Sequence, residues 1–169
     1  MLNTPLPSPR QTFAIIAAGC LGLILVGLFM QYVMELIPCA LCITQRIFII
    51  AVGLMALIGF LHAPTNYGQK VYSGLGVIFA VAGGSFSSRQ IYLQGLPADQ
   101  VPACGPDITY MFENFPILDA FSLLLRGDGN CAEVAWTFLG ISIPGWTLVA
   151  FAGLVLFNLW QFIRLPQQK

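Results

Sequence analysis

The sequence predicts an all-α membrane protein, a four-transmembrane-helix bundle whose last two spans are joined by a long loop with a short interfacial helix. Three observations predict this class. The composition is 57% hydrophobic and only 8% charged, whereas ordinary soluble domains carry about 25% charged residues. Four apolar runs are each long enough for a helix that crosses a hydrocarbon core of about 30 Å. Finally, one end of these runs carries four basic residues and no acidic residue, whereas all seven acidic residues lie at or near the other end.

The first apolar run carries no charge between Gln11 and Met34. A cleaved signal peptide and a lipoprotein signal ending at Cys20 are the alternatives, and both require the run to end near a cleavage point. Because the run continues well past Cys20, we expect a retained helix in which this cysteine packs as a small hydrophobe. The four spans are predicted within one membrane domain, 1–169, at residues 13–34, 42–62, 71–92 and 144–163.

The second and third apolar runs fix the positions of the Cys-x-x-Cys pair and of the long polar loop. The second run reaches span length only if residues 41–46 are included, which puts a Cys-x-x-Cys pair at its N-terminal edge. The third run is rich in small residues between Val71 and Ser88, so we expect this helix to lie centrally in the bundle. The loop 94–142 follows, and its aromatic segment 110–125 is expected to lie flat in the membrane interface.

Charge asymmetry predicts the orientation. Four basic residues fall on the side of the termini: Arg10, Lys70, Arg164 and Lys169. All seven acidic residues fall on the loop side or at its border. The positive-inside rule then places both termini in the cytoplasm. It places Cys39, Cys42, Cys104 and Cys131 outside, in an oxidising compartment. A net charge of zero gives no case for nucleic-acid binding.

The pair Cys39 and Cys42 is the first candidate for chemistry. Cys42 lies in the first turn of the predicted second helix, with Arg46 one turn further along the same face. A helix N-terminus and a neighbouring cation both favour the thiolate, which indicates redox activity. The alternative is a stabilising disulfide, but a bridge that closes so short a loop constrains the unfolded chain little.

Metal and haem sites fit the cysteines less well. A c-type haem requires histidine directly after the second cysteine, where this chain has Ile43. Zinc would need four ligands at suitable spacing, and His62 is predicted on the opposite membrane face. Cys104 and Cys131 on their own would fit a loop-closing disulfide. Two dithiols on one membrane face can also exchange disulfides.

These features together resemble the bacterial disulfide-bond formation protein B family, DsbB. The resemblance rests on four spans, the motif Pro38-Cys39-x-x-Cys42-x-x-x-Arg46, the Cys104/Cys131 loop and the run from Cys131 to Gly140. It implies a quinone-dependent disulfide oxidoreductase of the bacterial inner membrane, multi-pass, with a periplasmic loop 94–142. Such an enzyme reoxidises a DsbA-like periplasmic thiol oxidoreductase and passes electrons to ubiquinone or menaquinone, with no metal.

The resemblance also implies residue roles. Cys104 would form the mixed disulfide with DsbA, and Cys131 would then attack Cys39. Cys42, released as a thiolate, would donate to the quinone, whose oxygen Arg46 would polarise. Some relatives have a histidine after the third helix where this chain has Gln94-Gly95, so Gln94 is the candidate for a second quinone contact.

Two other interpretations of the function remain open at this point. One is a structural four-span protein whose two disulfides merely hold its outer loops, in which case any polar residue could replace Arg46. The other is a DsbB-like oxidase with a dedicated substrate.

Overall fold

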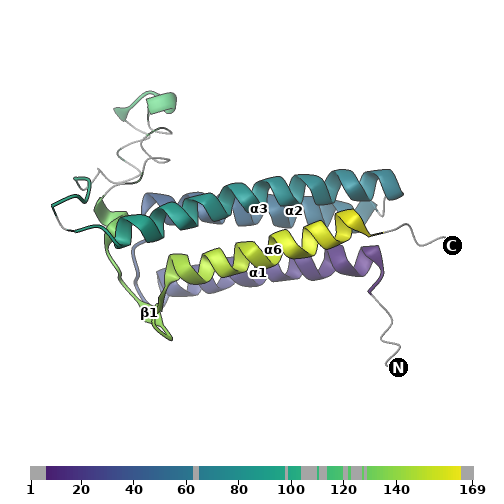
Figure 1. Cartoon of the computed structure of the whole chain (residues 1–169), viewed down its shortest axis with the longest axis horizontal. Helices are drawn as coiled ribbons and strands as arrows, with labels where there is room; N and C mark the ends of the chain where they lie inside the picture. Colours follow the sequence, from purple (N-terminus) through teal and green to yellow (C-terminus); the bar gives the residue numbers. More distant parts are fainter. Residues whose placement is uncertain are drawn as a thin grey trace.

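A computed structural model describes residues 7–62, 65–97, 99–103, 110, 114–119, 122, 127 and 129–164. Its four long helices are α1 (Pro9–Tyr32), α2 (Ala40–His62), α3 (Asn66–Gln94) and α6 (Ile143–Ile163). They run alongside one another, with both chain termini at one end and the long loop at the other (Figure 1). These ends are called the terminus end and the loop end below. Cys104 and half of the predicted interfacial segment 110–125 lie outside the described residues.

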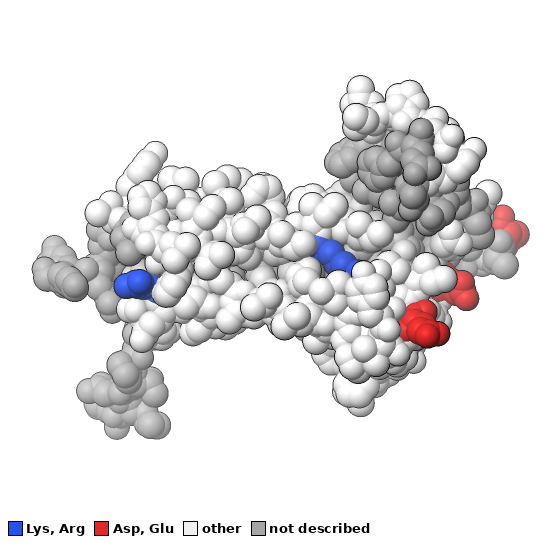
Figure 2. Space-filling model, turned by 180° about the vertical axis from the view of Figure 1, so that it is seen from behind, with Lys and Arg blue, Asp and Glu red and all other residues white. Residues whose placement is uncertain are grey.

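The four helices confirm the predicted fold class. Each is long and apolar enough to cross a membrane. Their outward faces carry large apolar side chains at high exposure, such as Leu21, Ile78 and Leu156, as a surface in contact with lipid requires. Acidic side chains gather at the loop end, and much of the surface between the two ends is uncharged (Figure 2).

Local capping sets helix ends that differ from the predicted span limits. The first span was expected from residue 13, but α1 begins at Pro9 because Ser8 and Gln11 form a reciprocal capping box. Beyond its last turn, Glu35 adopts a left-handed conformation, with φ of 55°. The third span was expected from residue 71, but α3 begins at Asn66, after Thr65 in the extended N-cap conformation.

α3 lies centrally, as its small residues predicted, and packs against both α2 and α6. A side chain at Gly83 would overlap the ring of Phe151, and one at Gly76 would overlap the amide of Asn158. Close approach of α3 and α6 therefore depends on these glycines. α1 packs on α2, where Cys20 contacts Gly53. Cys20 is thus a buried residue of the helix interface, as expected.

Two small elements close the loop end. The 3₁₀ turn η1 (Gly129–Ala132) packs against α3 and α2. The strands β1 (Thr137–Phe138) and β2 (Ile141–Ser142) form an antiparallel hairpin, which was not among the elements predicted for the loop. Its turn residues, Leu139 and Gly140, both have positive φ, which matches the twist of a two-residue hairpin turn.

A candidate thiol site at the loop end

Cys39 and Cys42 lie where the chain enters α2. Cys39 precedes the first helical residue, and its carbonyl oxygen accepts a hydrogen bond from the Ile43 N–H at 3.2 Å. Cys42 lies in the first turn of the helix, and the Cys39 thiol donates to its sulfur across 3.1 Å. Spacing along one helical turn therefore brings the two sulfurs together, as the sequence predicted.

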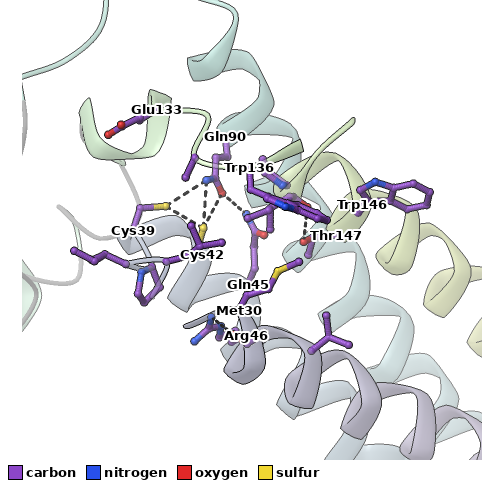
Figure 3. A pocket seen from close by; sticks show the side chains of 18 of the residues that line it. Met30, Cys39, Cys42, Gln45, Arg46, Gln90, Glu133, Trp136, Trp146 and Thr147 are labelled. Carbon is purple, nitrogen blue, oxygen red and sulfur yellow. Dashed lines mark hydrogen bonds between the residues drawn. The ribbon is translucent and has the colours of Figure 1, made fainter. Parts of the chain in front are cut away.

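A pair of buried glutamine amides faces these sulfurs. The Gln90 side-chain nitrogen lies 3.2 Å from the Cys39 sulfur and 3.3 Å from the Cys42 sulfur. The Gln90 carbonyl oxygen accepts a hydrogen bond from the Gln45 amide at 2.8 Å. Figure 3 shows the two sulfurs and both amides joined in one network. Each glutamine is only 3% exposed, so α2 and α3 hold the network away from solvent.

Cys131 reaches the same group of sulfurs from η1. Its side chain is fully buried in a small apolar cluster with Leu41 and Leu93. The pKa of the Cys39 thiol is raised well above its usual value. The largest cause is the hydrogen bond between Cys131 and Cys39, and the second is the hydrogen bond between Cys39 and Cys42. Cys39 therefore keeps its proton and stands between the other two sulfurs, an arrangement suited to thiol–disulfide exchange.

Arg46 follows Cys42 by one helical turn, but its hydrogen bonds go to α1. Its guanidinium donates to the side-chain oxygen of Gln31 and, at 2.9 Å, to the carbonyl oxygen of Gly27. A Cβ atom at position 27 would lie 3.3 Å from the Arg46 Nε. The absence of a side chain at Gly27 therefore lets the guanidinium lie flat against α1.

Cys39, Cys42 and Arg46 line one cavity of about 620 Å³. The wall contributed by α1 is apolar and includes Leu23, Val26 and Met30. The opposite wall includes aromatic side chains of the hairpin region, where Trp136 stacks on Phe138 with ring centroids 5.9 Å apart. A mostly apolar cavity with one cation and a few amides is the usual form of a small-molecule site.

Gln94, the other predicted cofactor contact, borders the same cavity. Its side chain is half-buried, and its amide donates to the carbonyl oxygen of Glu133 at 3.4 Å. Gln90, one helical turn earlier, is the glutamine that contacts the sulfurs. Of the predicted site residues, Cys39, Cys42 and Cys131 lie together. The glutamine that reaches the Cys39 and Cys42 sulfurs is Gln90, not the predicted Gln94.

Sequence reasoning missed Gln45, Gln90, Gln31 and the tryptophans of the cavity wall. A polar residue inside an apolar span is costly and usually functional, and that signal was available for Gln45 and Gln90. Gln45 also follows Cys42 by three residues, which places both on one side of the helix. No comparable signal marked Trp136.

A protein-family model described as "Disulfide bond formation protein DsbB" matches residues 9–161. "Disulfide bond formation protein B" of Saccharophagus degradans is 60% identical over 164 residues, which cover 97% of this chain and 99% of the relative. The protein of the same name from Stutzerimonas stutzeri is 45% identical, over 94% of this chain and 98% of that protein. "Disulfide bond formation protein B 1" of Pseudomonas aeruginosa is 40% identical, over 95% of this chain and 98% of that protein.

Proposed function

The chain belongs to the DsbB family of disulfide bond formation proteins, and from this premise we propose that it is a thiol:quinone oxidoreductase. It reoxidises a DsbA-like periplasmic dithiol protein and delivers the electrons to ubiquinone or menaquinone. One observation carries the proposal: three sulfurs, of Cys131, Cys39 and Cys42, are linked by hydrogen bonds beside a cavity of about 620 Å³.

The proposed exchange begins with Cys104. The reduced partner attacks the Cys104–Cys131 disulfide at Cys104, and Cys131 leaves as a thiolate. Cys131 then attacks Cys39 of the Cys39–Cys42 disulfide, so that one S–S bond forms, one breaks, and Cys42 leaves as a thiolate. The partner's second thiolate attacks the partner sulfur of the mixed disulfide, Cys104 leaves as a thiolate, and the partner departs with its own disulfide. The hydrogen bond between Cys131 and Cys39 supports the order of the middle step.

The cavity residues fit a quinone ring. The apolar wall of α1 and the ring of Trp136 would hold its faces, and the Arg46 guanidinium would face a carbonyl oxygen, for which it has the donors. When bound, a quinone supplies an acceptor for two electrons and two protons that enters from lipid. The anchoring of Arg46 on Gln31 and Gly27 fixes the cation in advance at the cavity wall.

We place the protein in the bacterial inner membrane with both termini cytoplasmic and the cysteine loop periplasmic, because of the charge asymmetry. A membrane-impermeant thiol reagent tests this in spheroplasts after mild reduction. Cys104 should be labelled in intact spheroplasts, as a thiol outside the membrane requires. Labelling that occurs only after lysis would reverse the orientation.

Anaerobic mixing tests the activity. Purified protein is combined with reduced DsbA and ubiquinone, and quinone absorbance is followed together with DsbA thiols. One quinone should be consumed for each DsbA disulfide formed, and Cys42→Ser should stop both changes. Stable disulfides with no quinone consumption would instead support a structural role. Consumption with another dithiol protein but not with DsbA would indicate a dedicated substrate.

A further inference from the structure

We propose that Gln90 is a further catalytic residue, whose N–H stabilises the Cys42 sulfur as it leaves, and that Gln45 is the residue that orients it. The inference rests on the proposed exchange at Cys39 and adds a second donor to that step. In the reaction, the Cys131 sulfur bonds to Cys39, the Cys39–Cys42 bond breaks, and the electron pair stays on Cys42. The charge on the leaving sulfur then needs a hydrogen-bond donor.

The geometry places Gln90 at this sulfur. Its amide nitrogen is 3.3 Å from the Cys42 sulfur and 3.2 Å from the Cys39 sulfur, so the donor is already close to both atoms of the breaking bond. A bonded sulfur accepts hydrogen bonds weakly, whereas a thiolate accepts them strongly. The contact therefore strengthens as the bond breaks, which is how a group accelerates a reaction rather than merely binding its reactant.

Arg46 is less directly placed for this task. Both of its hydrogen bonds go to α1, to Gln31 and to the carbonyl oxygen of Gly27. Its charge acts on the site through space, while the direct contact with the Cys42 sulfur comes from Gln90. Arg46 therefore supplies a positive charge at the cavity wall, and Gln90 supplies a neutral hydrogen-bond donor at the sulfurs.

Gln45 determines which end of the Gln90 amide faces the sulfurs. Its own amide donates to the Gln90 carbonyl oxygen at 2.8 Å, and the Cys42 thiol lies within hydrogen-bond reach of the same oxygen at 3.6 Å. The Gln90 nitrogen is the nearer atom to the sulfurs, at 3.2 Å from Cys39 and 3.3 Å from Cys42. Reversing the Gln90 amide would place two donors together and make the carbonyl oxygen, rather than the N–H, the nearer group to a developing thiolate. Because both side chains are buried, such a reversal would not be compensated by water.

The test uses the full-length chain with Cys104→Ala and Cys131→Ala, oxidised at Cys39–Cys42, in detergent and without quinone. Reduced glutathione attacks Cys39 and expels Cys42, which imitates the proposed step. The rate of mixed-disulfide formation is measured by quenching and mass spectrometry. Neither quinone nor a protein partner is present, so failure here is distinct from failure of the proposed overall function.

Methionine is the substitution of choice because it is close to glutamine in length and lacks its N–H donors. Gln90→Met should slow the reaction about tenfold to a hundredfold, as expected for losing a hydrogen bond to a charged group. Gln45→Met should slow it about threefold to tenfold, although this side chain does not touch the sulfurs. In the double variant the rate should equal that of Gln90→Met, since Gln45 acts through Gln90.

Gln161→Met is the matched control. This glutamine is buried to a similar degree at the terminus end of α6, where its amide donates to the Pro9 carbonyl oxygen. The control should react at the parent rate. A parent rate in Gln90→Met would overturn the proposal, as would an equal loss in Gln161→Met. Additive losses in the double variant would overturn the orienting role of Gln45.

Discussion

The two ends of the bundle both bury glutamine or asparagine side chains and both hold an arginine, yet they differ in what these groups contact. At the terminus end, Asn158 and Gln161 donate to backbone carbonyl oxygens. Arg164 there lies over a tryptophan ring and also donates to a backbone carbonyl. At the loop end, the amides of Gln45 and Gln90 bond to each other and to two sulfurs.

The difference shows that burial of a polar side chain is not in itself a sign of a site. Amides that donate to backbone carbonyl oxygens satisfy groups of the folded helices and face no titratable atom through that bond. Amides that face titratable atoms beside a cavity can change their contacts when the charge on those atoms changes. The predictions below exploit this contrast, with activity assigned to one end and stability to the other.

The largest effect is expected for Cys42→Ser at the loop end. Oxidation of the dithiol partner should fall to the uncatalysed background, because serine cannot form the disulfide that receives the electrons. The melting temperature should barely change, since the two side chains are nearly equal in size. The measurement is quinone consumption together with thermal unfolding in detergent. Substantial turnover in this variant would remove Cys42 from the electron path.

Arg46→Ala compared with Arg164→Ala is the next test. The apparent KM for quinone should rise at least about tenfold in Arg46→Ala, the loss expected for a hydrogen bond from a charged donor. Arg46→Lys should recover part of this, because the charge remains while the planar fork of donors is lost. The mixed disulfide with the partner should form at a near-normal rate in both.

Arg164→Ala should keep the parent KM, since its contacts lie at the other end of the bundle. Steady-state kinetics over a range of quinone concentrations decide the comparison. A parent KM in Arg46→Ala, or an equal rise in both variants, would contradict the division between the two ends.

Gly76→Val should affect stability and leave the site intact. A side chain at position 76 would meet the Asn158 amide, and overpacking of this kind costs about 1–3 kcal/mol. The expected result is a lower melting temperature with an unchanged KM for quinone in the protein that remains folded. If the KM rose instead, the terminus end would be coupled to the cavity.

Cys20→Ala should have the smallest effect. The thiol packs on Gly53 between α1 and α2, where it serves as a small hydrophobe. Activity should stay within about twofold of the parent, and stability should fall by about 1 kcal/mol at most. Loss of most of the oxidase activity would mean that Cys20 belongs to the redox set.

Much of this architecture could be predicted because the responsible features are local. A long uncharged run specifies a span wherever it occurs, and spacings of three and four residues place Cys39, Cys42 and Arg46 near one face of a helix. The first span was predicted to end at residue 34, and α1 ends at Tyr32, with Glu35 just beyond it in a left-handed conformation.

The remaining features depend on how separate elements meet. Gln90 faces the sulfurs because of the register between α2 and α3, which no spacing within one helix reveals. Gln90 lies one helical turn before Gln94, the residue that the sequence indicated as a second quinone contact. The hairpin that carries Phe138 has strands of two residues each, too short for a period-two pattern to appear.

Cys131 is held by packing as well as by its hydrogen bond with Cys39. Its side chain packs in an apolar cluster with Leu41 of α2 and Leu93 of α3, so the loop that carries Cys131 is anchored to both helices at this point. In the proposed reaction, Cys131 therefore meets Cys39 at a high effective concentration that depends on the fold rather than on diffusion. Dilution of the soluble partner would then slow its encounters with the protein while leaving the internal relay unaffected.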